Sequence, residues 1–404
     1  MSSNRPADMT KVLHLCSYYM DTRVYMNLFE QLDSNKIEQA IKIFVRKASN
    51  MGINMTELAH GQLRFDKTWS FYHRLLYKNK IRLAFDKLDA ESDMVNYNII
   101  HAHTWFSDGG TAYLLYKKYQ IPYIITVRNT DINVFYDWLF YLKKFGHQIL
   151  DRASKIVFLS PAYRTKLLQK LPDAYKEMIS QKSVIISNGV DDFWLDNKNA
   201  RNRLNAVNGD FNLLYVGSVM RLKNIERIIE SFVEIKKKID KASLTLVGFT
   251  NATRYEASIR RKYMNISDLH FVDKIADKQV LRSYYRNADV FLMPSLKETF
   301  GLVYIEALSQ GLPIIYSRGQ GVDGYFDNLK TGIPVTPGSI REISDALIRI
   351  YNNYTQYVEE DLSYLEDFRW EGISKKYIEI YNEICPKSYL KNQAPSGLST
   401  PLRV

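Results

Sequence analysis

Short, almost continuously apolar runs, separated by longer helical patterns, constrain this chain more than any other feature. Runs such as 12–16, 98–102 and 213–216 contain few polar positions, which is typical of parallel strands buried on both faces. Helical patterns such as 224–238 and 340–354 lie between such runs. The alternation predicts an α/β fold with a doubly wound parallel sheet, and the whole pattern occurs twice.

A polar, turn-rich stretch at 188–208 separates the two halves of this pattern. We therefore expect two domains, 1–190 and 191–385, that face each other across a cleft. The last helix, at about 370–384, either stays with the second domain or packs back onto the first. The tail 386–404 is rich in proline and serine and is expected to be disordered.

Composition and charge narrow the setting of the protein. A hydrophobic content of 46% excludes collagen-like and wholly disordered chains. Two cysteines, Cys16 and Cys385, build neither a disulfide framework nor a zinc cluster and fit a reducing cytosol. We find no signal-peptide pattern at the start and no membrane-spanning run, so we expect a cytoplasmic location. The net charge of +11 suits an anionic small molecule, a membrane surface or a nucleic acid.

The segment PSLKETFGLVYIEALSQGLPII, at 294–315, carries two carboxylates that are eight positions apart. Glu298 lies in a loop after a predicted strand, and Glu306 lies one turn inside the following predicted helix. The start of that helix offers free backbone N–H groups to a phosphate, and Gly301 allows an anion to approach closely. The alternative is a solvent-facing helix with two acidic residues.

The segment LLYVGSVMRLKNIERIIESF, at 213–232, places two cations after another predicted strand. The strand ends at Gly217, and Arg221 and Lys223 follow in a short loop before a helix. Cations in such a position can hold a diphosphate without a metal ion. The alternative is a solvated basic turn.

Three glycines, Gly319, Gly321 and Gly324, spell a dinucleotide-binding fingerprint. That motif needs a helix directly after it, and the residues that follow are too few before the next glycine. We therefore expect a glycine-rich turn, which can still line a ligand site.

Together, the two strand-end segments resemble the family 4 glycosyltransferases, which are retaining enzymes of the GT-B architecture. In the second half the resemblance also covers SNGVD at 187–191 and FRWEGISKKYIEIY at 368–381. In the first half it covers IIHAHTWFSDGG at 99–110, PYIITVRNTDIN at 122–133 and KIVFLSPAYR at 155–164. The implied fold has two Rossmann-like domains, with the nucleotide sugar bound by the second and the acceptor by the first.

The resemblance also implies roles for individual residues. Glu306 would hold the ribose of the donor and Glu298 the hydroxyls of its sugar, while Arg221 and Lys223 would neutralise the diphosphate leaving group. The remaining donor-binding residues would be Gly217, Thr299, Phe300, Gly301 and Leu302. No Asp-x-Asp triplet is present, so we expect no metal ion and no cofactor beside a UDP- or GDP-linked sugar as co-substrate.

The first half departs from the family pattern at two places. The loop after the first predicted strand has no glycine, so we expect Tyr19 and Arg23, together with Asp108, in an unusual acceptor site. Arg128 stands where many relatives carry a histidine near the reacting carbon, which leaves His103 as the nearest histidine. Arg128, His103 and Glu298 are therefore the catalytic candidates, and the alternative for His103 is a core residue at a strand end.

Two stretches, 69–88 and 134–144, mix aromatic, aliphatic and basic residues. This mixture is typical of helices that lie on anionic membranes, and the alternative is a helix that packs on its own domain. A nucleic-acid partner is not expected, because the predicted strands are buried and offer no open aromatic sheet.

The sequence thus predicts a retaining transferase of a hexose or N-acetylhexosamine from a nucleotide sugar to a glycan acceptor. The basic amphipathic stretches favour a lipid-linked acceptor, as in surface polysaccharide synthesis, and a peripheral position on the cytoplasmic face of the membrane. Two alternatives stay open. One is a GT-B sugar-nucleotide epimerase or phosphorylase, and the other is a non-catalytic, membrane-associated glycan-binding protein.

Overall fold

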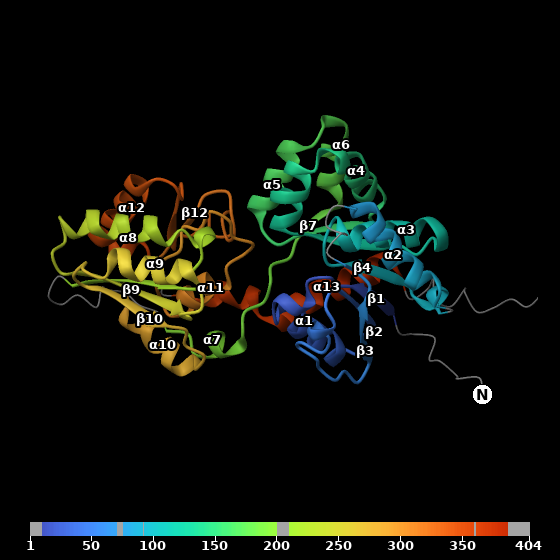
Figure 1. Cartoon of the computed structure of the whole chain (residues 1–404), viewed down its shortest axis with the longest axis horizontal. Helices are drawn as coiled ribbons and strands as arrows, with labels where there is room; N and C mark the ends of the chain where they lie inside the picture. The colour runs from blue at the N-terminus through green and yellow to red at the C-terminus, as the bar shows by residue number, and fades with distance from the viewer. Residues whose placement is uncertain (1–9, 71–75, 92, 200–209, 359–360, 387–404) are drawn as a thin grey trace, which may run out of the picture. The chain divides into compact units, whose positions relative to one another are not determined.

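The computed structural model describes residues 10–70, 76–91, 93–199, 210–358 and 361–386. Contacts divide the chain into two compact units (Figure 1). The first unit comprises Met1–Val157, Pro172–Val184 and Ser374–Val404, and the second comprises Phe158–Leu171 and Ile185–Ile373. The last helix, α13 (Trp370–Ile384), therefore belongs for most of its length to the first unit.

The first unit is built on a sheet of seven strands among the described residues, in the order β3-β2-β1-β4-β5-β6-β7. β1 pairs in parallel with both β2 and β4, so the strand order reverses between β1 and β4. The strands are β1 (Lys11–Leu15), β2 (Glu38–Val45), β3 (Gly61–Lys67), β4 (Ile99–Ala102), β5 (Tyr123–Val127), β6 (Lys155–Phe158) and β7 (Ser183–Ile185). Its described helices and helical turns are η1 (Tyr19–Asp21), α1 (Val24–Ser34), η2 (Ala48–Asn50), α2 (Tyr77–Asp89), η4 (Met94–Asn96), α3 (Ser107–Tyr119), η5 (Asp131–Tyr136), η6 (Phe140–Leu142), α4 (Lys143–Arg152) and α6 (Asp173–Lys182).

The second unit has a six-stranded sheet in the order β10-β9-β8-β11-β12-β13, again for the described residues. Here the order reverses between β8 and β11. The strands are β8 (Phe211–Val216), β9 (Ala242–Phe249), β10 (Leu269–Asp273), β11 (Val290–Leu292), β12 (Ile314–Ser317) and β13 (Gly332–Val335). Its described helices and helical turns are α5 (Pro161–Lys170), α7 (Asp192–Asp196), η7 (Arg221–Lys223), α8 (Ile225–Lys236), α9 (Arg254–Tyr263), α10 (Lys278–Asn287), α11 (Leu302–Ser309), α12 (Ile340–Asn352), η8 (Tyr354–Gln356) and η9 (Ser363–Phe368).

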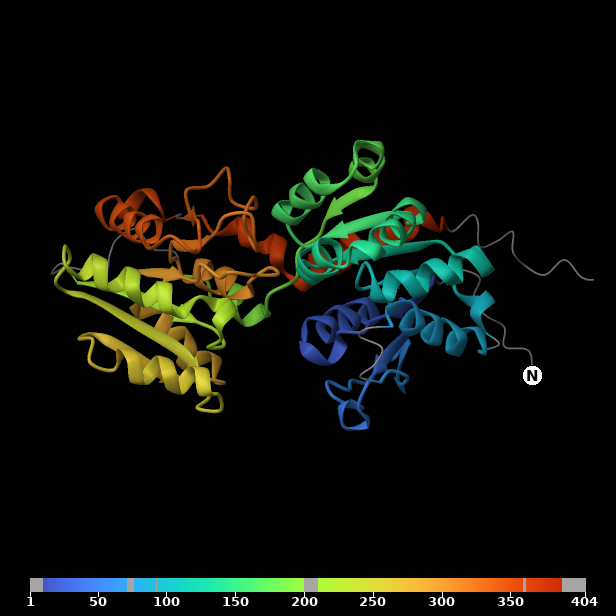
Figure 2. The ribbon, with the colours of Figure 1, turned by 45° about the horizontal axis from the view of Figure 1, so that its top comes forward.

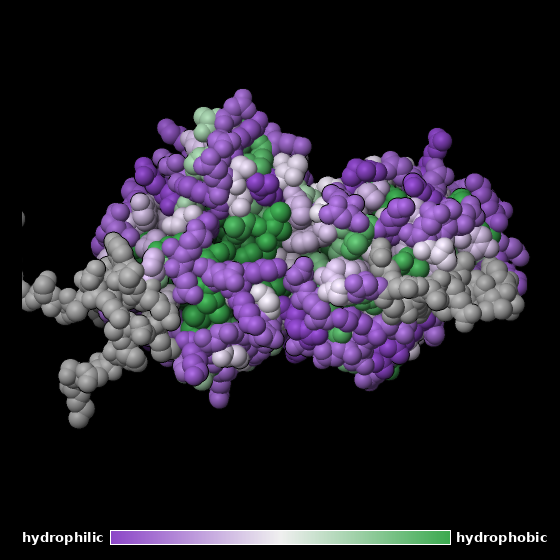
Figure 3. All heavy atoms as spheres, turned by 180° about the vertical axis from the view of Figure 1, so that it is seen from behind, coloured by the Kyte–Doolittle hydropathy of each residue, from purple (hydrophilic) through white to green (hydrophobic). Residues whose placement is uncertain are grey.

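Both sheets are covered by helices, and their central strands are buried along their whole length (Figures 1 and 2). All residues of β4, β5, β11 and β12 are buried. The surface over these layers is mostly hydrophilic (Figure 3). Because a parallel sheet is covered on both faces, its strands must be apolar at nearly every position. The predicted class, two doubly wound parallel sheets, is confirmed.

Several helices begin where side chains can cap them. Thr253 and Glu256 form a reciprocal capping box at the start of α9. Asp277 accepts backbone N–H bonds at the start of α10, and Ser339 does so at the start of α12. Each cap satisfies donors that the helix itself leaves unpaired, and replacing one costs about 1 kcal/mol.

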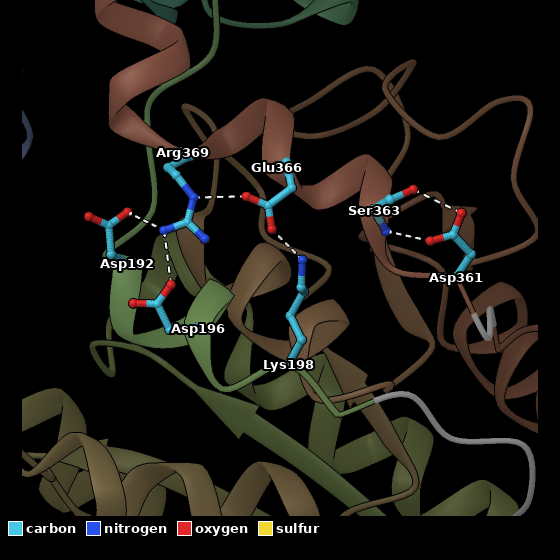
Figure 4. Close-up of polar contacts among 7 residues, drawn as sticks. All are labelled: Asp192, Asp196, Lys198, Asp361, Ser363, Glu366 and Arg369. Atoms are coloured by element: carbon cyan, nitrogen blue, oxygen red, sulfur yellow. Dashed lines mark hydrogen bonds and ion pairs between the residues drawn. The ribbon is translucent and has the colours of Figure 1, made fainter.

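Within the second unit, Arg369 joins two segments that are far apart in the sequence (Figure 4). Its Nη1 lies 3.1 Å from a carboxylate oxygen of Asp192 and 3.0 Å from one of Asp196, and its Nε lies 2.8 Å from Glu366. Glu366 also pairs with Lys198. The hydrogen bond that Arg369 donates to Glu366 is the main cause of the raised pKa of Arg369. The network fixes η9 and Arg369, which follows it, against α7 and Lys198.

Both cysteines lie in the first unit, and both are buried. Cys16 follows β1 and has no exposed surface, while Cys385 follows α13 with its Sγ 3.2 Å from the carbonyl oxygen of Asn98. Burial raises the pKa of Cys16 and raises that of Cys385 to about 11. The two thiols are therefore protonated and shielded in the folded protein.

Gly248 allows the end of β9 to pass close to the end of β8. Its φ of +131° lies outside the range of ordinary L residues, and a Cβ there would overlap the carbonyl oxygen of Gly217. We expect Gly248→Ala to lower the free energy of unfolding by at least about 2 kcal/mol, measured by urea denaturation. Gly338→Ala is the matched control, because a Cβ at Gly338 meets no atom within 4 Å. Equal stability of the two variants would contradict this interpretation.

Candidate functional site

The loops after β8, β11 and β13 are held together at one edge of the second sheet by Asn224. This residue adopts a left-handed conformation with φ 63°. Its Nδ2 donates to the carbonyl oxygen of Pro294 at 3.0 Å and to that of Pro337 at 2.5 Å. The backbone N–H of Leu296 also donates to the carbonyl oxygen of Leu222 at 2.9 Å. The two predicted strand-end segments therefore form one rigid edge.

Lys223 and Glu298 form an ion pair at this edge. Lys223 Nζ lies 2.6 Å from Glu298 Oε2, and only 20% and 10% of the two side chains are exposed. Glu298 Oε1 also accepts the backbone N–H of Thr299 at 3.0 Å. The structure thus brings together the residues that sequence analysis assigned to the diphosphate and to the sugar. A charged pair in such a sheltered place has a fixed geometry and is screened little by salt.

Two further residues position Glu298, and sequence analysis missed both. Gln320 Oε1 accepts the backbone N–H of Glu298 at 3.1 Å. The Tyr163 hydroxyl donates to the carbonyl oxygen of Glu298 and lies 3.1 Å from Gln320 Oε1. A Cβ at Gly321 would press on the carbonyl oxygen of Phe300, so the predicted glycine-rich turn packs tightly against this loop. In the sequence, the glycine-rich turn that contains Gln320 was the signal that could have pointed to this residue. No sequence motif around Tyr163 indicates that it lies beside Glu298.

Gly301 opens α11 with a φ of +87°. A Cβ at this position would overlap the ring of Tyr304, so glycine is needed for the chain to enter the helix here. Phe300 is buried against Tyr325, and Leu302 packs partly against the core. The predicted donor-binding residues Thr299 to Leu302 therefore present mainly backbone groups at a helix N-terminus, where N–H groups favour an anion.

Glu306 lies one turn further along α11 and is half-buried. Its Oε2 accepts the hydroxyl of Tyr285 at 3.0 Å. The pKa of Glu306 is raised to about 7, mainly by burial and also by the charge of Asp191, while the hydrogen bond from Tyr285 and the charge of Lys278 oppose the rise. The hydrogen bond from Tyr285 occupies one lone pair of Oε2, so the carboxyl oxygens can accept further hydrogen bonds from a ligand. Tyr285 comes from α10 and was not foreseen from the sequence.

Arg221 takes a different direction from Lys223, although both belong to η7. Its side chain is exposed, and its guanidinium lies 5.1 Å from the ring centroid of Tyr255 in α9. Gly217 closes β8 with its backbone N–H donated to the carbonyl oxygen of Val247 at 3.0 Å. Of the two predicted cations, Lys223 is the one that the structure pairs with Glu298.

In the first unit, the structure brings together Arg128 and His103. Arg128 follows β5, and its Nε donates to the carbonyl oxygen of His103 at 3.1 Å. Its guanidinium lies 4.5 Å from the ring centroid of Tyr25. His103 follows β4 and is almost wholly buried. Arg128 is thus anchored by a carbonyl oxygen and an aromatic ring at the carboxyl edge of the first sheet.

His103 belongs to a buried group of three imidazoles. His14 Nδ1 lies 3.1 Å from His103 Nε2, and the rings of His101 and His103 stack at 4.0 Å. The three residues bring possible metal-ligating atoms within 4.8 Å of one another. However, the ring nitrogens of His101 contact the hydroxyls of Thr126 at 3.0 Å and Tyr381 at 2.8 Å. Burial lowers the pKa of all three, that of His14 to about 3, so the group is a neutral, hydrogen-bonded part of the core.

The structure places the predicted acceptor residues Tyr19 and Arg23 apart. Tyr19 is fully buried, stacks on Phe29, and donates its hydroxyl to the carbonyl oxygen of Asn54 at 2.7 Å. Arg23 is exposed just before α1. Tyr19 therefore supports the fold of the loop after β1 through its packing.

Asp108, the third predicted acceptor residue, is buried in the first turn of α3. It accepts the backbone N–H of Ser17 at 3.2 Å and the hydroxyl of Thr104 at 3.1 Å. Burial raises its pKa to about 7. Asp108 thus holds the loop after β1, and this loop borders a cavity of about 620 Å³ within the first unit.

The two basic, aromatic stretches differ in what they bury. α2 turns its apolar face inward, where the buried residues are Tyr77, Ile81, Ala84, Phe85 and Leu88. In the stretch 134–144, by contrast, Val134, Trp138, Phe140 and Tyr141 are exposed. Figure 3 shows apolar side chains gathered on one face of the first unit. No helix among the described residues is both long enough and apolar enough to cross a membrane.

The histidine group predicts a pH-dependent stability. The unfolded chain binds a proton at His14 below about pH 6.5, whereas folded His14 stays neutral down to about pH 3. Its contribution to stability is therefore complete above pH 6.5 and is lost as the pH falls. Between pH 6.5 and 5, wild type should lose about 1.5 kcal/mol more unfolding free energy than His14→Leu. Buried carboxyl groups such as Asp108 change the unfolding free energy in the opposite direction as the pH falls, and they do so in both proteins. The effect of His14 is therefore the difference between wild type and His14→Leu, measured by chemical denaturation at each pH.

His270→Leu is the control for this experiment, because it removes an exposed imidazole from the second unit. It should show the pH dependence of wild type. A His14→Leu protein that follows the wild-type curve would contradict the neutral core.

Comparisons with known proteins agree with this architecture. Residues 45–192 match the family model of Glycosyltransferase Family 4, and residues 196–364 match that of Glycosyl transferases group 1. The chain is 27% identical to the alpha-monoglucosyldiacylglycerol synthase of Acholeplasma laidlawii, over 58% of this chain and 62% of that protein.

Two solved structures show the same fold. Sucrose-phosphate synthase from Thermosynechococcus elongatus has a TM-score of 0.69 at 19% identity, and the match covers 93% of this chain and 99% of the synthase chain. HepE of Anabaena, in complex with UDP and glucose, has a TM-score of 0.63 at 15% identity, and the match covers 93% of this chain and 100% of the HepE chain. Since two successive family models span most of the chain and the fold agrees, the chain belongs to the family 4 glycosyltransferases, group 1 enzymes of the GT-B type.

Proposed function

We propose that this glycosyltransferase transfers a hexose or N-acetylhexosamine, with retention, from a UDP- or GDP-linked sugar to a lipid-linked glycan. The observation that carries the proposal is the edge of the second sheet, where Lys223, Glu298 and the N-terminus of α11 lie in one rigid set of loops. Such an edge offers a cation and free N–H groups to a diphosphate and a carboxylate to sugar hydroxyls.

In this proposal the donor is bound along α11. The diphosphate lies at the start of the helix, and Lys223 neutralises the charge that it gains as the glycosidic bond breaks. Glu306, already bonded to Tyr285, accepts hydrogen bonds from the ribose hydroxyls. HepE, which has the same fold, forms a complex with UDP and glucose, and this supports a nucleotide-sugar donor here.

The transfer step breaks the bond between the anomeric carbon and the diphosphate oxygen, which leaves with the electron pair. The acceptor hydroxyl oxygen forms its bond to the same carbon from the same face, and its proton passes to the departing diphosphate. Glu298, held by Lys223 and by the N–H of Thr299, orients the donor sugar through its hydroxyls. Arg128, anchored to the carbonyl oxygen of His103, provides positive charge on the acceptor side.

The lipid-linked acceptor is supported by the exposed residues of the stretch 134–144. Trp138 and Phe140 expose 76% and 78% of their surface, which is unusual for large aromatic side chains. Lys143 and Lys144 follow after Tyr141 and Leu142. Aromatic rings beside lysines suit the interface of an anionic membrane. One relative is named for the synthesis of a glycolipid, which agrees with an acceptor of this kind.

Substitution of Glu306 tests the donor site. Glu306→Gln weakens one charge-assisted interaction with the ribose, so we expect the affinity for UDP or GDP to fall about tenfold or more. Isothermal titration calorimetry of the full chain measures the loss. Glu234→Gln is the control, since Glu234 is exposed on α8 and pairs with Lys237. Unchanged nucleotide affinity in Glu306→Gln would sink the assignment of this edge as the donor site.

Substitution of the exposed aromatics tests the membrane contact. The double variant Trp138→Ser/Phe140→Ser should lose most of its sedimentation with vesicles that contain anionic phospholipid, at low salt. Val95→Ser is the control, because Val95 is 73% exposed in the same unit. Equal vesicle binding by wild type and the double variant would remove this surface from the proposal.

A further inference from the structure

The cavity of the first unit lies at the carboxyl ends of β1 and β2, beside η5. It has a volume of about 620 Å³, which is enough for a sugar unit with its substituents. The lining residues that matter to its chemistry are Tyr18, Phe44, Arg46, Trp69, Lys80 and Phe135. Aromatic faces and two cations thus share one hollow.

Lys80 is the unusual member of this lining. It comes from α2, its Nζ donates to the hydroxyl of Ser107 at 2.9 Å, and the same atom lies 4.0 Å from the ring centroid of Trp69. Among the residues that the structure describes, none presents a carboxylate oxygen within ion-pairing distance of it. Burial lowers its pKa to about 8. An ammonium group kept in a sheltered cavity without a close counter-ion is costly, unless a ligand supplies the negative charge.

The nearby carboxylates are committed elsewhere. Asp131 accepts the backbone N–H groups of Trp105, Phe106 and Arg128, and Asp108 accepts that of Ser17. Burial raises the pKa of Asp108 to about 7 and that of Asp131 to about 6, so both carry less charge than exposed carboxylates near neutral pH.

The other charges of the lining oppose each other. Arg46 is exposed, and its positive charge lowers the pKa of Asp21, which burial raises, and also contributes to the lowered pKa of Lys80. Both residues line the cavity. Lys80 is therefore the sheltered cation of this lining: the charges of Asp108 and Asp131 raise its pKa from a distance, but neither forms an ion pair with it.

The aromatic residues indicate what carries the negative charge. The rings of Trp69 and Phe44 lie 5.7 Å apart, and Tyr18 and Phe135 complete the apolar part of the lining. Flat aromatic faces bind the C–H faces of a pyranose ring, while a lysine recognises a carboxylate or phosphate on its edge.

From these observations we infer that the cavity binds a negatively charged sugar of the acceptor, with Lys80 recognising the anionic group and Trp69 its ring. The inference rests on the proposed function insofar as the first unit holds the acceptor. The anionic group is either the carboxylate of a uronic acid or a phosphate attached to the sugar, and both offer the same charge-assisted hydrogen bonds.

Ligand-observed NMR titrations of the full chain test the inference. The probes are glucuronate, glucose 1-phosphate and neutral methyl glucoside. Wild type should bind one or both anionic probes at least tenfold more tightly than methyl glucoside. Tighter binding of glucuronate identifies a uronic acid, and tighter binding of glucose 1-phosphate identifies a sugar phosphate. Equal binding of the neutral and anionic probes overturns the inference.

Three variants assign the preference to Lys80. Lys80→Met keeps the length of the side chain over Trp69 and should abolish the preference for anions, while Lys80→Arg should retain most of it. Lys78→Met is the matched control, because Lys78 is exposed on the same helix, and it should behave as wild type. An anion preference that survives in Lys80→Met contradicts the role of Lys80.

The melting temperature and the UDP affinity of each variant are measured in parallel. Unchanged UDP affinity in Lys80→Met shows that the second unit is intact, so a lost preference then belongs to the cavity. Absence of UDP and GDP binding in wild type would count against the proposed donor site, while the anion preference of the cavity would be judged separately.

Discussion

Burial of both faces of two parallel sheets is the constraint on which the rest of this structure depends. Most side chains of the central strands are apolar, so many polar residues lie in the loops at the carboxyl edges. There they bind backbone groups that would otherwise lose their partners: Asn224 holds two carbonyl oxygens, and Asp131 holds three N–H groups. The same edges therefore carry both the polar groups that fix the loops and the polar groups that meet a ligand.

The two units use this arrangement differently. In the second unit, Lys223 and Glu298 already satisfy each other, and Gln320 and Tyr163 hold the backbone around Glu298. Its loops are thus organised before any ligand binds, which lowers the entropy cost of binding. In the first unit, the ammonium group of Lys80 lies over the ring of Trp69 and donates to Ser107, and among the described residues it forms no ion pair with a carboxylate. Chemical selectivity is therefore expected to depend more on the first unit.

The fold was predictable from the sequence, because the apolar runs and the helical periods are local signals. The candidate site at the edge of the second sheet was predictable in part, because Lys223, Glu298 and Gly301 lie in recognisable strand-end segments. Tyr163 and Tyr285 reach the site from other helices, and only long-range packing brings them there.

Two sequence-level expectations depended on side-chain direction. Tyr18 lines the cavity, while its neighbour Tyr19 fills the core, and a short helical turn decides between them. The pattern of α2 likewise could not reveal whether its apolar face meets a membrane or its own domain, because both contacts require the same spacing. In the folded structure the apolar face of α2 is buried, whereas several large apolar side chains of the stretch 134–144 are exposed.

The two buried cysteines give the chain an intrinsic reporter. Both belong to the first unit, and the sequence contains no third cysteine. A thiol reagent can modify Cys16 only when the sheet around β1 opens, because the folded state hides and protonates its sulfur. The rate of thiol modification therefore follows the opening of the first unit alone. Total fluorescence or circular dichroism records both units, so the two signals together separate the stability of each half without any engineered label.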